Sequence, residues 1–469
     1  MFCYTKAMSG GGGHTGFRLP LMGLAEKLAD SHSGLSIDGK AIMYAFPIVL
    51  LGFLVLDPGQ TMRNFAFLIF FAPLWMPSIL VYYAFMRFHQ YRRWVFHSKQ
   101  QYVLLELRMP RDTRKSPAAM EAIFSNLHLA PGEGTWWKKY ILGGSRPWFS
   151  FEIASLGGRV HFYVWTRESM RRAVETYFYA QYPGVEVVEA IDYSRIIDPN
   201  SPPYRTFACE FGQSKPDPYP IKSYIDFGLG DNPKPEESVD PVAQVIEFMG
   251  SLGPQEQLWL QFVIRVTKGE KFKGRKNAKG KQYTWKDEGR EEVERIREEA
   301  TVQTEYKDKM TGEMKQASGF PNPTKGQQEM IAAIERNIGK LGFDVGIRAV
   351  YTAPADKYYP TIGALVTSIF KPFNSESYNS LGSVPHFSEA FKDYPWEDPK
   401  GVKLRKSLHE AVTVYRMRSF YHPPYEGAFM TMSTEELASL YHVPSSAITT
   451  PSLPRIQSAT GEAPADLPI

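Results

Sequence analysis

The pattern of apolar and polar positions separates an N-terminal part typical of membranes from a globular remainder. Residues 41–56 ("AIMYAFPIVLLGFLVL") and 65–86 ("FAFLIFFAPLWMPSILVYYAFM") contain no charged residue, and the turn-forming stretch "DPGQTMRN" separates them. A helix needs about 20 mostly apolar residues to cross a bilayer, so the second run is long enough and the first is slightly short. The pattern therefore predicts a transmembrane helical hairpin over residues 41–86, after a flexible segment over residues 1–40.

Two other interpretations of the apolar runs are weaker. A signal peptide would end at a small-residue cleavage site, but the first run begins forty residues into the chain and a second run follows it. A buried helical hairpin in a soluble core remains open, although charge-free runs back to back are rare in soluble folds.

Basic and aromatic residues flank the apolar runs and indicate an orientation. Arg87, Arg92, Arg93 and Trp94 follow the second run, and lysine and arginine residues precede the first. Such residues anchor helices at the membrane interface, and positive charge stays on the cytoplasmic side. We expect a multi-pass protein of the inner (cytoplasmic) membrane, with both termini and the large C-terminal part in the cytoplasm.

The part of the chain after the apolar runs shows an alternation of strands and helices. Strand-like residues 102–110 precede a helical pattern over 116–129, two alternating strands around Gly157 and Gly158, a helical pattern over 166–183 and a short strand. This order is the βαββαβ order of ferredoxin-like α+β folds. We predict a ferredoxin-like α+β domain over residues 100–230.

A second α+β unit is predicted over residues 240–444, with a charged insertion at 268–318. Apolar periodicity predicts helices at 241–252, 323–342 and 360–373, and strands at 256–267 and 343–354. Near its end, Ser433 and Glu436 form the signature of a capping box that starts a helix. The sequence leaves open whether the two units are a repeat, and residues 445–469 are expected to form an extended, proline-containing tail.

Composition narrows the classes of function. The whole chain has a net charge of +4, which does not mark it as a nucleic-acid-binding protein. Cys3 and Cys209 are the two cysteines, and their separation matches neither a zinc-ligand spacing nor a disulfide framework. A reducing, intracellular environment is the favoured interpretation.

A lysine-rich stretch, "KGEKFKGRKNAKGKQ" (268–282), is the candidate interaction site. It contains seven basic residues against one glutamate: Lys268, Lys271, Lys273, Arg275, Lys276, Lys279 and Lys281. The stretch could contact phosphates of nucleic acid, contact anionic lipid, or be a disordered solvated loop. The charged helix that follows is expected to project into solvent, supported by pairs such as Glu291–Arg295.

The sequence gives no candidate catalytic, cofactor-binding or metal-binding residues. Gly269 and Gly274 have the glycine spacing of a P-loop, but Arg275 and Lys276 follow where Lys and Ser or Thr are required. The ten histidines are scattered, and no helix carries a zinc-binding His-Glu-x-x-His pattern. We therefore expect a protein that is not an enzyme and has no cofactor.

Four stretches carry a resemblance to a known family. They are "VLLELRMPRDTRKSPAAMEAIFSNLH", "FSFEIASLGGRVHFYVWT", "VETYFYAQYPGVEV" and "MSTEELASLYHVP…TPSLPR". Together they resemble the cytosolic pre-motor region, a domain of unknown function, of membrane-anchored conjugation or type IV secretion-like ATPases related to the bacterial HerA and FtsK DNA pumps. In such proteins the final proline-rich segment leads into a P-loop motor. This sequence departs from the pattern because it ends at "EAPADLPI" without a motor.

The resemblance implies a membrane-anchored, non-enzymatic component of a DNA or protein translocation machine. Its expected partners are the membrane, a separate P-loop motor ATPase and copies of itself. The alternative is a membrane-tethered nucleic-acid-binding protein, with DNA as a possible partner, that acts through the lysine-rich stretch. A membrane enzyme is a third interpretation, which no constellation of residues supports.

Overall fold

The fold is seen in a computed structural model that describes residues 51, 55–110, 115–131, 133–198, 203–230, 240–307, 314–384, 386–389 and 398–444. These residues form two compact units. The helical unit holds the described residues up to 97 together with 135–144, and the sheet unit holds 98–134 and 145–444. Most of the predicted first apolar span, the N-terminal segment 1–40 and the tail 445–469 lie outside the described residues.

The helical unit contains α3 (Pro58–Phe70), most of α4 (Ala72–Ser98) and a short π-helix (Trp137–Ile141). Among the residues that the structure describes, no single helix is long and apolar enough to cross a membrane. A pair of helical segments, Pro58–Leu74 and Met76–Ser98, meets the requirements of length and composition together but is bent by 59°. The sequence predicted one span over 65–86, but α3 ends at Phe70 and the 59° bend lies between Leu74 and Met76. Pro77 inside α4 lacks a backbone N–H and its ring crowds the carbonyl four residues earlier, which favours a bend there.

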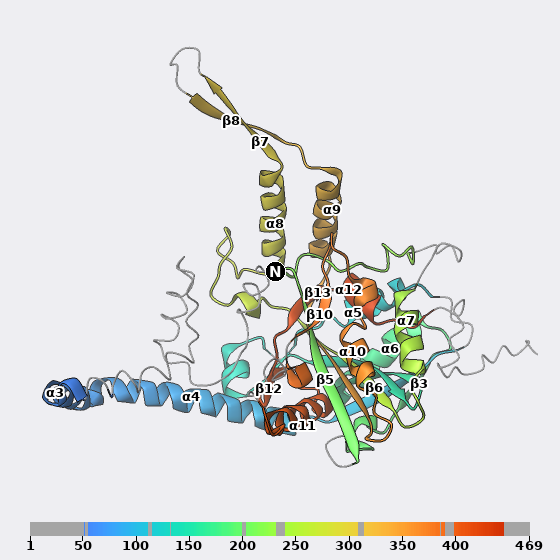
Figure 1. The fold of residues 1–469 in the computed structure, drawn as a ribbon, viewed down its shortest axis with the longest axis horizontal. Coiled ribbons are helices and arrows are strands. Elements are labelled where there is room, and N and C mark those ends of the chain that lie inside the picture. The colour runs from blue at the N-terminus through green and yellow to red at the C-terminus, as the bar shows by residue number, and fades with distance from the viewer. Residues whose placement is uncertain are drawn as a thin grey trace, which may run out of the picture. The chain divides into compact units, whose positions relative to one another are not determined.

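The sheet unit is a mixed α+β fold with one large antiparallel sheet (Figure 1). Its strands lie in the order β10-β5-β9-β6-β2-β3-β1-β4, and the ninth strand, β13, also pairs with β9. The strands are β1 (Tyr102–Arg108), β2 (Trp148–Leu156), β3 (Arg159–Arg167), β4 (Glu186–Glu189), β5 (Tyr204–Gln213), β6 (Gln257–Val266), β9 (Gly342–Pro354), β10 (Leu381–Val384) and β13 (Met430–Ser433).

The two halves of this sheet repeat one connectivity. The first half follows the order β1-α5-β2-β3-α6-β4, and the second follows β5-α7-β6-β9-α10-β10, with a long insertion between β6 and β9. Counted from the centre of the sheet, the strand orders β2-β3-β1-β4 and β6-β9-β5-β10 correspond position by position. The halves meet where β2 pairs with β6, from Trp148 opposite Arg265 to Leu156 opposite Gln257. We call this pairing the seam.

The turn between β2 and β3 confirms the predicted two-residue hairpin. Gly157 and Gly158 both have positive φ angles, 64° and 82°, which a type I′ turn requires. A methyl group at Gly157 would also lie 2.5 Å from the backbone oxygen of Pro254. Glycine is therefore needed at this position both for the turn and for close approach of the neighbouring chain.

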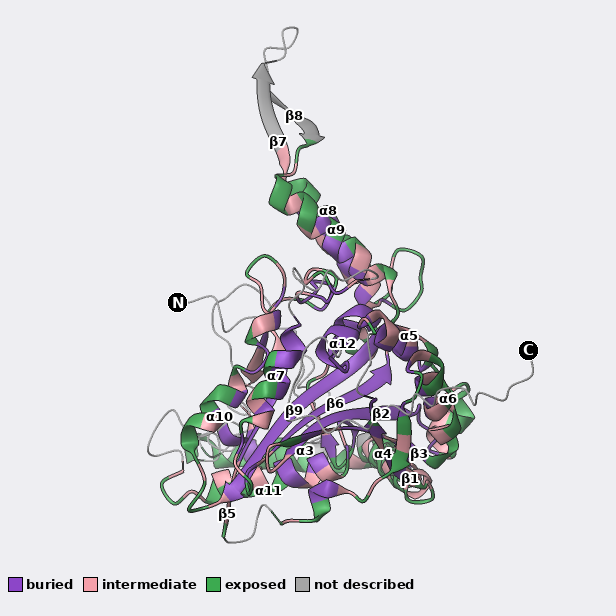
Figure 2. Ribbon diagram, turned by 90° about the vertical axis from the view of Figure 1, so that its right-hand side faces the viewer, coloured by how far each residue is buried: buried purple, intermediate pink, exposed green. Residues whose placement is uncertain are grey.

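Successive residues of a strand point to opposite faces of the sheet. Both faces carry apolar side chains here, and helices cover both. In β6, Leu258, Leu260, Phe262 and Ile264 face one core cluster, and Trp259 and Val263 face the other. The strands are buried along most of their length (Figure 2). The first face is covered by α5 (Ala118–Asn126), α6 (Arg171–Gln181), α7 (Pro241–Gly250), α10 (Pro360–Thr367) and α12 (Thr434–Leu440), and the second by α11 (Val402–Arg416) with the hairpin of β11 (Tyr421–His422) and β12 (Tyr425–Glu426).

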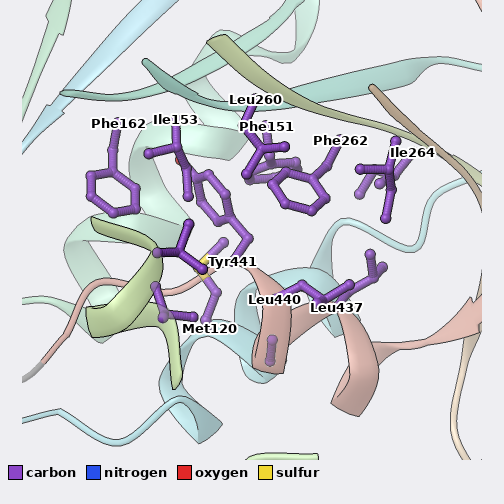
Figure 3. Close-up of a cluster of buried hydrophobic side chains, with 14 of the residues drawn as sticks. Met120, Phe151, Ile153, Phe162, Leu260, Phe262, Ile264, Leu437, Leu440 and Tyr441 are labelled. Carbon is purple, nitrogen blue, oxygen red and sulfur yellow. The ribbon is translucent and has the colours of Figure 1, made fainter. Parts of the chain in front are cut away.

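Helix α12 is the most deeply buried helix segment among these. The predicted capping box is confirmed: the Ser433 hydroxyl accepts from the Glu436 backbone N–H at 3.2 Å, and the Glu436 carboxylate accepts from the Ser433 N–H at 2.9 Å. Just after the helix, the Tyr441 ring lies 5.1 Å from that of Phe151 and 5.5 Å from that of Phe162 (Figure 3). The segment is thus part of the main core beneath the seam.

The insertion forms an arm on the sheet unit. It comprises α8 (Trp285–Glu299), the hairpin β7 (Thr301–Lys307) and β8 (Met314–Pro321), and α9 (Lys325–Gly339). The two helices lie side by side and lead away from the sheet to the hairpin (Figure 1). A small cluster that includes Tyr219, Val293 and Ile334 holds the base of the arm.

The predicted helix within the insertion is confirmed, but the predicted Glu291–Arg295 pair is wrong. Arg295 pairs with Glu292 at 2.5 Å and with Glu299 at 3.1 Å. Glu291 instead accepts from Arg275 at 2.7 Å. Arg295 therefore pairs with acidic residues one helical turn before it and one turn after it, and the Glu291 carboxylate pairs with Arg275 of the lysine-rich stretch.

Candidate functional site

The lysine-rich stretch folds into a tight turn at the foot of the arm. Residues Lys276 and Gln282 form an antiparallel bridge, and the Asn277 side-chain oxygen accepts from the backbone N–H groups of Lys279 at 3.1 Å and Lys281 at 3.0 Å. The Gln282 amide donates to the Phe272 carbonyl at 2.8 Å. Asparagine favours such turns because its short side chain bonds its own backbone nearby. The turn has defined local structure, which differs from the disordered-loop interpretation.

Three of the seven predicted contact residues are held by acidic partners in the sheet unit. The Lys271 ammonium lies 2.8 Å from Asp217, and the Lys268 ammonium lies 4.0 Å from Glu133. Arg275 lies 2.7 Å from Glu291 and stacks 3.8 Å from the centre of the Tyr283 ring. These basic groups fix the turn to its surroundings, and their charge is largely balanced there.

The other four predicted residues remain available at the tip of the turn. Lys273, Lys276, Lys279 and Lys281 are exposed, and none of them forms an ion pair with a described residue. Acidic residues of the following helix offset much of the positive charge of the stretch, since residues 268–299 together contain eleven Lys or Arg residues and eight Asp or Glu residues. The positive patch is therefore local, and we call these four residues the lysine tip.

An acidic pair lies beneath the turn. Glu288 of α8 is mostly buried near Asp217 and Lys271, and burial together with the Asp217 charge raises the pKa of Glu288 to about 7. The Lys271 charge acts in the opposite direction. The state of the Glu288 carboxyl group thus changes near neutral pH, next to the residue that anchors the turn.

The predicted membrane-interface anchor lies on the C-terminal half of α4. Trp94 is 67% exposed, and Arg87 donates to the Tyr83 hydroxyl at 2.9 Å, with its guanidinium over that ring. Arg92 is turned toward another part of the helical unit and donates to the Ile141 carbonyl at 2.6 Å. Arg93 is half-buried on the same helix. The four residues are on one helix, but only Arg87 and Trp94 are exposed.

Sequence reasoning missed a second group beside this anchor. The segment "TWWKKYILGG" (135–144) belongs to the helical unit and carries exposed Trp136 and Trp137 next to Lys138 and Lys139. It has the same mixture of basic and aromatic residues that marked the flank of the second apolar run. The sequence alone could therefore have marked residues 135–144 as a second candidate for the membrane interface.

A buried polar cluster lies on the second face of the sheet, at the seam. Glu152 of β2 accepts from Arg418, from the Gln261 amide at 3.0 Å and from the Tyr193 hydroxyl at 2.8 Å. The Tyr193 and Tyr415 hydroxyls lie 2.7 Å apart, and burial raises the pKa of both phenols, so both stay neutral. The members come from four distant parts of the sequence, and no local pattern marked them. Because every member is buried, we interpret the cluster as structural.

The described residues offer no evident metal centre. Within them, no three His, Cys, Asp or Glu side chains come together as possible ligands of a metal ion. Cys209 is buried within β5. The sequence-based expectation that the protein has no catalytic residues and no cofactor stays a prediction.

Comparison with known proteins places the chain in a family. No curated protein matches it in sequence. A family profile described as a domain of unknown function matches residues 89–455, which extend from within α4 through the sheet unit. The match covers more than three quarters of the chain, which therefore belongs to this family, DUF8128.

Proposed function

We propose that the protein is a membrane-anchored, non-enzymatic component of a translocation machine of the type IV secretion or conjugation kind, and that it scaffolds or docks a separate motor ATPase. In this proposal α3 and α4 belong to the membrane hairpin, and the sheet unit lies in the cytoplasm. The two halves of the sheet are ferredoxin-like units, since their connectivity and strand order are those of that fold.

The observation that carries the anchoring is the composition of the helical unit. Its described residues, 51, 55–97 and 135–144, contain six Lys or Arg residues and one acidic residue, Asp57, at the start of α3. Their exposed surface is rich in large apolar side chains, among them Leu74, Leu80, Val81 and Trp94. An exposed apolar surface of this extent with basic and aromatic flanks suits a bilayer better than water.

Support for the translocation machine comes from the four sequence stretches that resemble pre-motor regions. The arm adds to this support, because α8, α9 and the hairpin are not needed to complete the sheet. The helices α8 and α9 are rich in charged residues and expose much of their surface (Figure 2). A projecting element of this kind is available for contacts with neighbouring copies or with a motor.

Membrane topology gives the first test. We expect the full chain to stay in membranes washed with alkaline carbonate, and reporter fusions at residues 20 and 110 both to report cytoplasm. A double substitution, L80D/V81D, should release the chain from the washed membranes because carboxylates on this helix would have to enter the bilayer. Release of the unsubstituted chain, or a periplasmic signal at residue 110, would contradict the proposed anchoring.

Partner binding gives the second test. A P-loop translocation ATPase from the same cell should co-purify with the full chain in mild detergent, and the chain alone should not hydrolyse ATP. The purification is repeated with a variant in which a short Gly-Ser linker replaces the arm residues 286–339. Loss of the ATPase from this variant would show that the arm makes the contact with the motor. ATP turnover that a point substitution in this chain abolishes would show the protein to be an enzyme and end the scaffold proposal.

The lysine tip favours nucleic-acid binding as a second candidate function. Four neighbouring lysines without acidic partners among the described residues, held on an ordered turn, can contact successive phosphates. Replacing all four with glutamine should reduce the magnitude of the slope of log affinity against log salt for duplex DNA by up to about 3.6, since each neutralised phosphate contributes about 0.9.

A matched control distinguishes the lysine tip from general charge. The control variant replaces four exposed lysines elsewhere, namely Lys325, Lys357, Lys400 and Lys406. If DNA binding depends on the tip, the control keeps the salt slope of the unsubstituted chain. Equal effects of the two variants, or no salt-dependent binding at all, would exclude the lysine tip as a specific nucleic-acid contact.

A further inference from the structure

The segment Thr135–Gly144 leaves the sheet unit and packs against α4 of the helical unit. Three α4 residues at helical spacing make the contact. Phe85 lies 6.0 Å and His89 lies 4.9 Å from the Tyr140 ring, measured between ring centres, and Arg92 donates to the Ile141 carbonyl at 2.6 Å. Positions 85, 89 and 92 share one face of α4. The segment is therefore a fixed part of the helical unit.

Gly143 closes this contact and cannot be replaced without moving α4. Its φ angle is +72°, and a methyl group built on it would lie 2.3 Å from the Arg92 backbone oxygen. No small side-chain movement could relieve so short a distance, because the obstructing atom belongs to the backbone of α4 and not to the end of a flexible side chain. The sequence pair Gly143–Gly144 thus allows the chain to pass directly over the helix.

The packing leaves one side of the segment apolar and exposed. Trp136 is 59% exposed, Trp137 is 58% exposed and Leu142 is 45% exposed. Lys138 is exposed beside them, and the Lys139 ammonium lies 5.7 Å from the centre of the Tyr140 ring. Two adjacent tryptophans in water are unfavourable, whereas indole rings with nearby lysines are enriched at the headgroup level of bilayers.

We propose that Thr135–Gly144 is a second membrane-contact element, which lies in the headgroup region of an anionic bilayer next to α4. This inference rests on the proposed anchoring of the helical unit. The occupant is a lipid surface and not a protein, since the segment is continuous with the acid-free, apolar surface of α4. Lys138 and Lys139 would contact lipid phosphates while both tryptophans sit among the glycerol groups.

Site-specific fluorescence in reconstituted full-length protein tests the proposal. The chain, with Cys3 replaced by serine and the buried Cys209 left in place, carries an NBD dye on L142C in vesicles of three parts phosphatidylcholine to one part phosphatidylglycerol. A label on I196C, in the sheet unit at a position that is 68% exposed, serves as the aqueous control. We expect brominated lipid to quench the dye at position 142 at least threefold more than at 196, and aqueous iodide to show the opposite order.

Two variants separate the parts of the mechanism. K138Q/K139Q should weaken lipid quenching at position 142 and remove its dependence on the phosphatidylglycerol fraction, because the positive charges are lost. G143V should abolish lipid quenching at 142 and leave a dye on Y91C of α4 in contact with lipid. A dye at 91 that still reports lipid shows that the helix remains in place in this variant.

The outcomes distinguish this inference from the proposed anchoring. If the chain leaves carbonate-washed vesicles, both fail. If the chain stays but position 142 is quenched by iodide and not by lipid, the anchoring stands and this inference is overturned. If neither quencher reaches position 142, a second copy or another segment of protein covers the tryptophans, and the inference is overturned as well.

Discussion

Arg418 binds Glu152 through a two-pronged ion pair at the seam of the sheet. Its Nε donates to one carboxylate oxygen at 2.9 Å and its Nη2 donates to the other at 3.1 Å, and both side chains are fully buried. Arg418 also donates to Asp192 at 2.6 Å and adopts a positive φ of 49°, which is uncommon outside glycine. The pair connects the turn after α11 to the strand at which the two halves meet.

Removing the arginine should unfold the sheet unit more easily. For R418M we expect a loss of about 3–5 kcal/mol in the free energy of unfolding, because Glu152 stays buried without its charge partner. R418K should also be destabilising, since one ammonium cannot serve both carboxylates in the same geometry. Chemical denaturation of the full chain in detergent measures both. The double variant E152Q/R418M also removes the Glu152 charge and should therefore be more stable than R418M. If it is not, the unpaired Glu152 charge does not cause the loss of stability in R418M.

The capping box of α12 gives a second stability prediction. S433A should cost about 1 kcal/mol, because the Glu436 N–H loses its acceptor at the helix start. S433T keeps the hydroxyl group and should lose less, although its extra methyl group must fit a buried site. The denaturant midpoint of the full chain reports both values. A midpoint for S433A equal to that of the unsubstituted chain would mean that the cap does not stabilise the core.

The Glu436 carboxyl group should make stability depend on pH. Burial raises the pKa of this side chain from 4.5 to about 7, against the lowering effect of hydrogen bonds from Ser433 and Ile221. Between these two pH values the folded chain keeps a proton that the unfolded chain releases. Its contribution is therefore full below about pH 4.5 and is lost as the pH rises through 7, by up to about 3 kcal/mol.

E436Q tests this dependence because glutamine keeps the capping-box pattern and does not titrate. The measurement is the difference in unfolding free energy between the unsubstituted chain and E436Q at pH 5 and at pH 8. We expect this difference to shift in favour of E436Q at the higher pH. A constant difference across that range would show that Glu436 titrates at its ordinary value.

Two strand glycines form a matched pair for a packing prediction. A methyl group at Gly346 of β9 would lie 2.4 Å from the buried Phe420 ring, whereas nothing lies within 4 Å of one at Gly382 of β10. G346A should cost about 1–3 kcal/mol through overpacking, and G382A should change stability by less than about 0.5 kcal/mol. Thermal unfolding of the two variants side by side decides the matter, and equal effects would refute the close contact.

Local sequence determined the elements that need only their own residues. The period of apolar side chains marked β2, β6 and α9, the Gly157–Gly158 pair marked a hairpin, and Ser433 with Glu436 marked a helix start. Each of these signals acts within a few residues, through turn geometry, capping or alternation of faces. The charged stretch at 268–282 was likewise visible as a concentration of lysines.

Tertiary structure alone decided which distant elements meet. The joining of two similar halves at the seam depends on hydrogen bonds between β2 and β6, more than a hundred residues apart in sequence, and no local period encodes such a pairing. The same holds for Arg418 beside Glu152 and for Gly143 above Arg92. Tertiary structure also decided which basic residues of the stretch have acidic partners, because Asp217, Glu133 and Glu291 reach the stretch only in the folded chain.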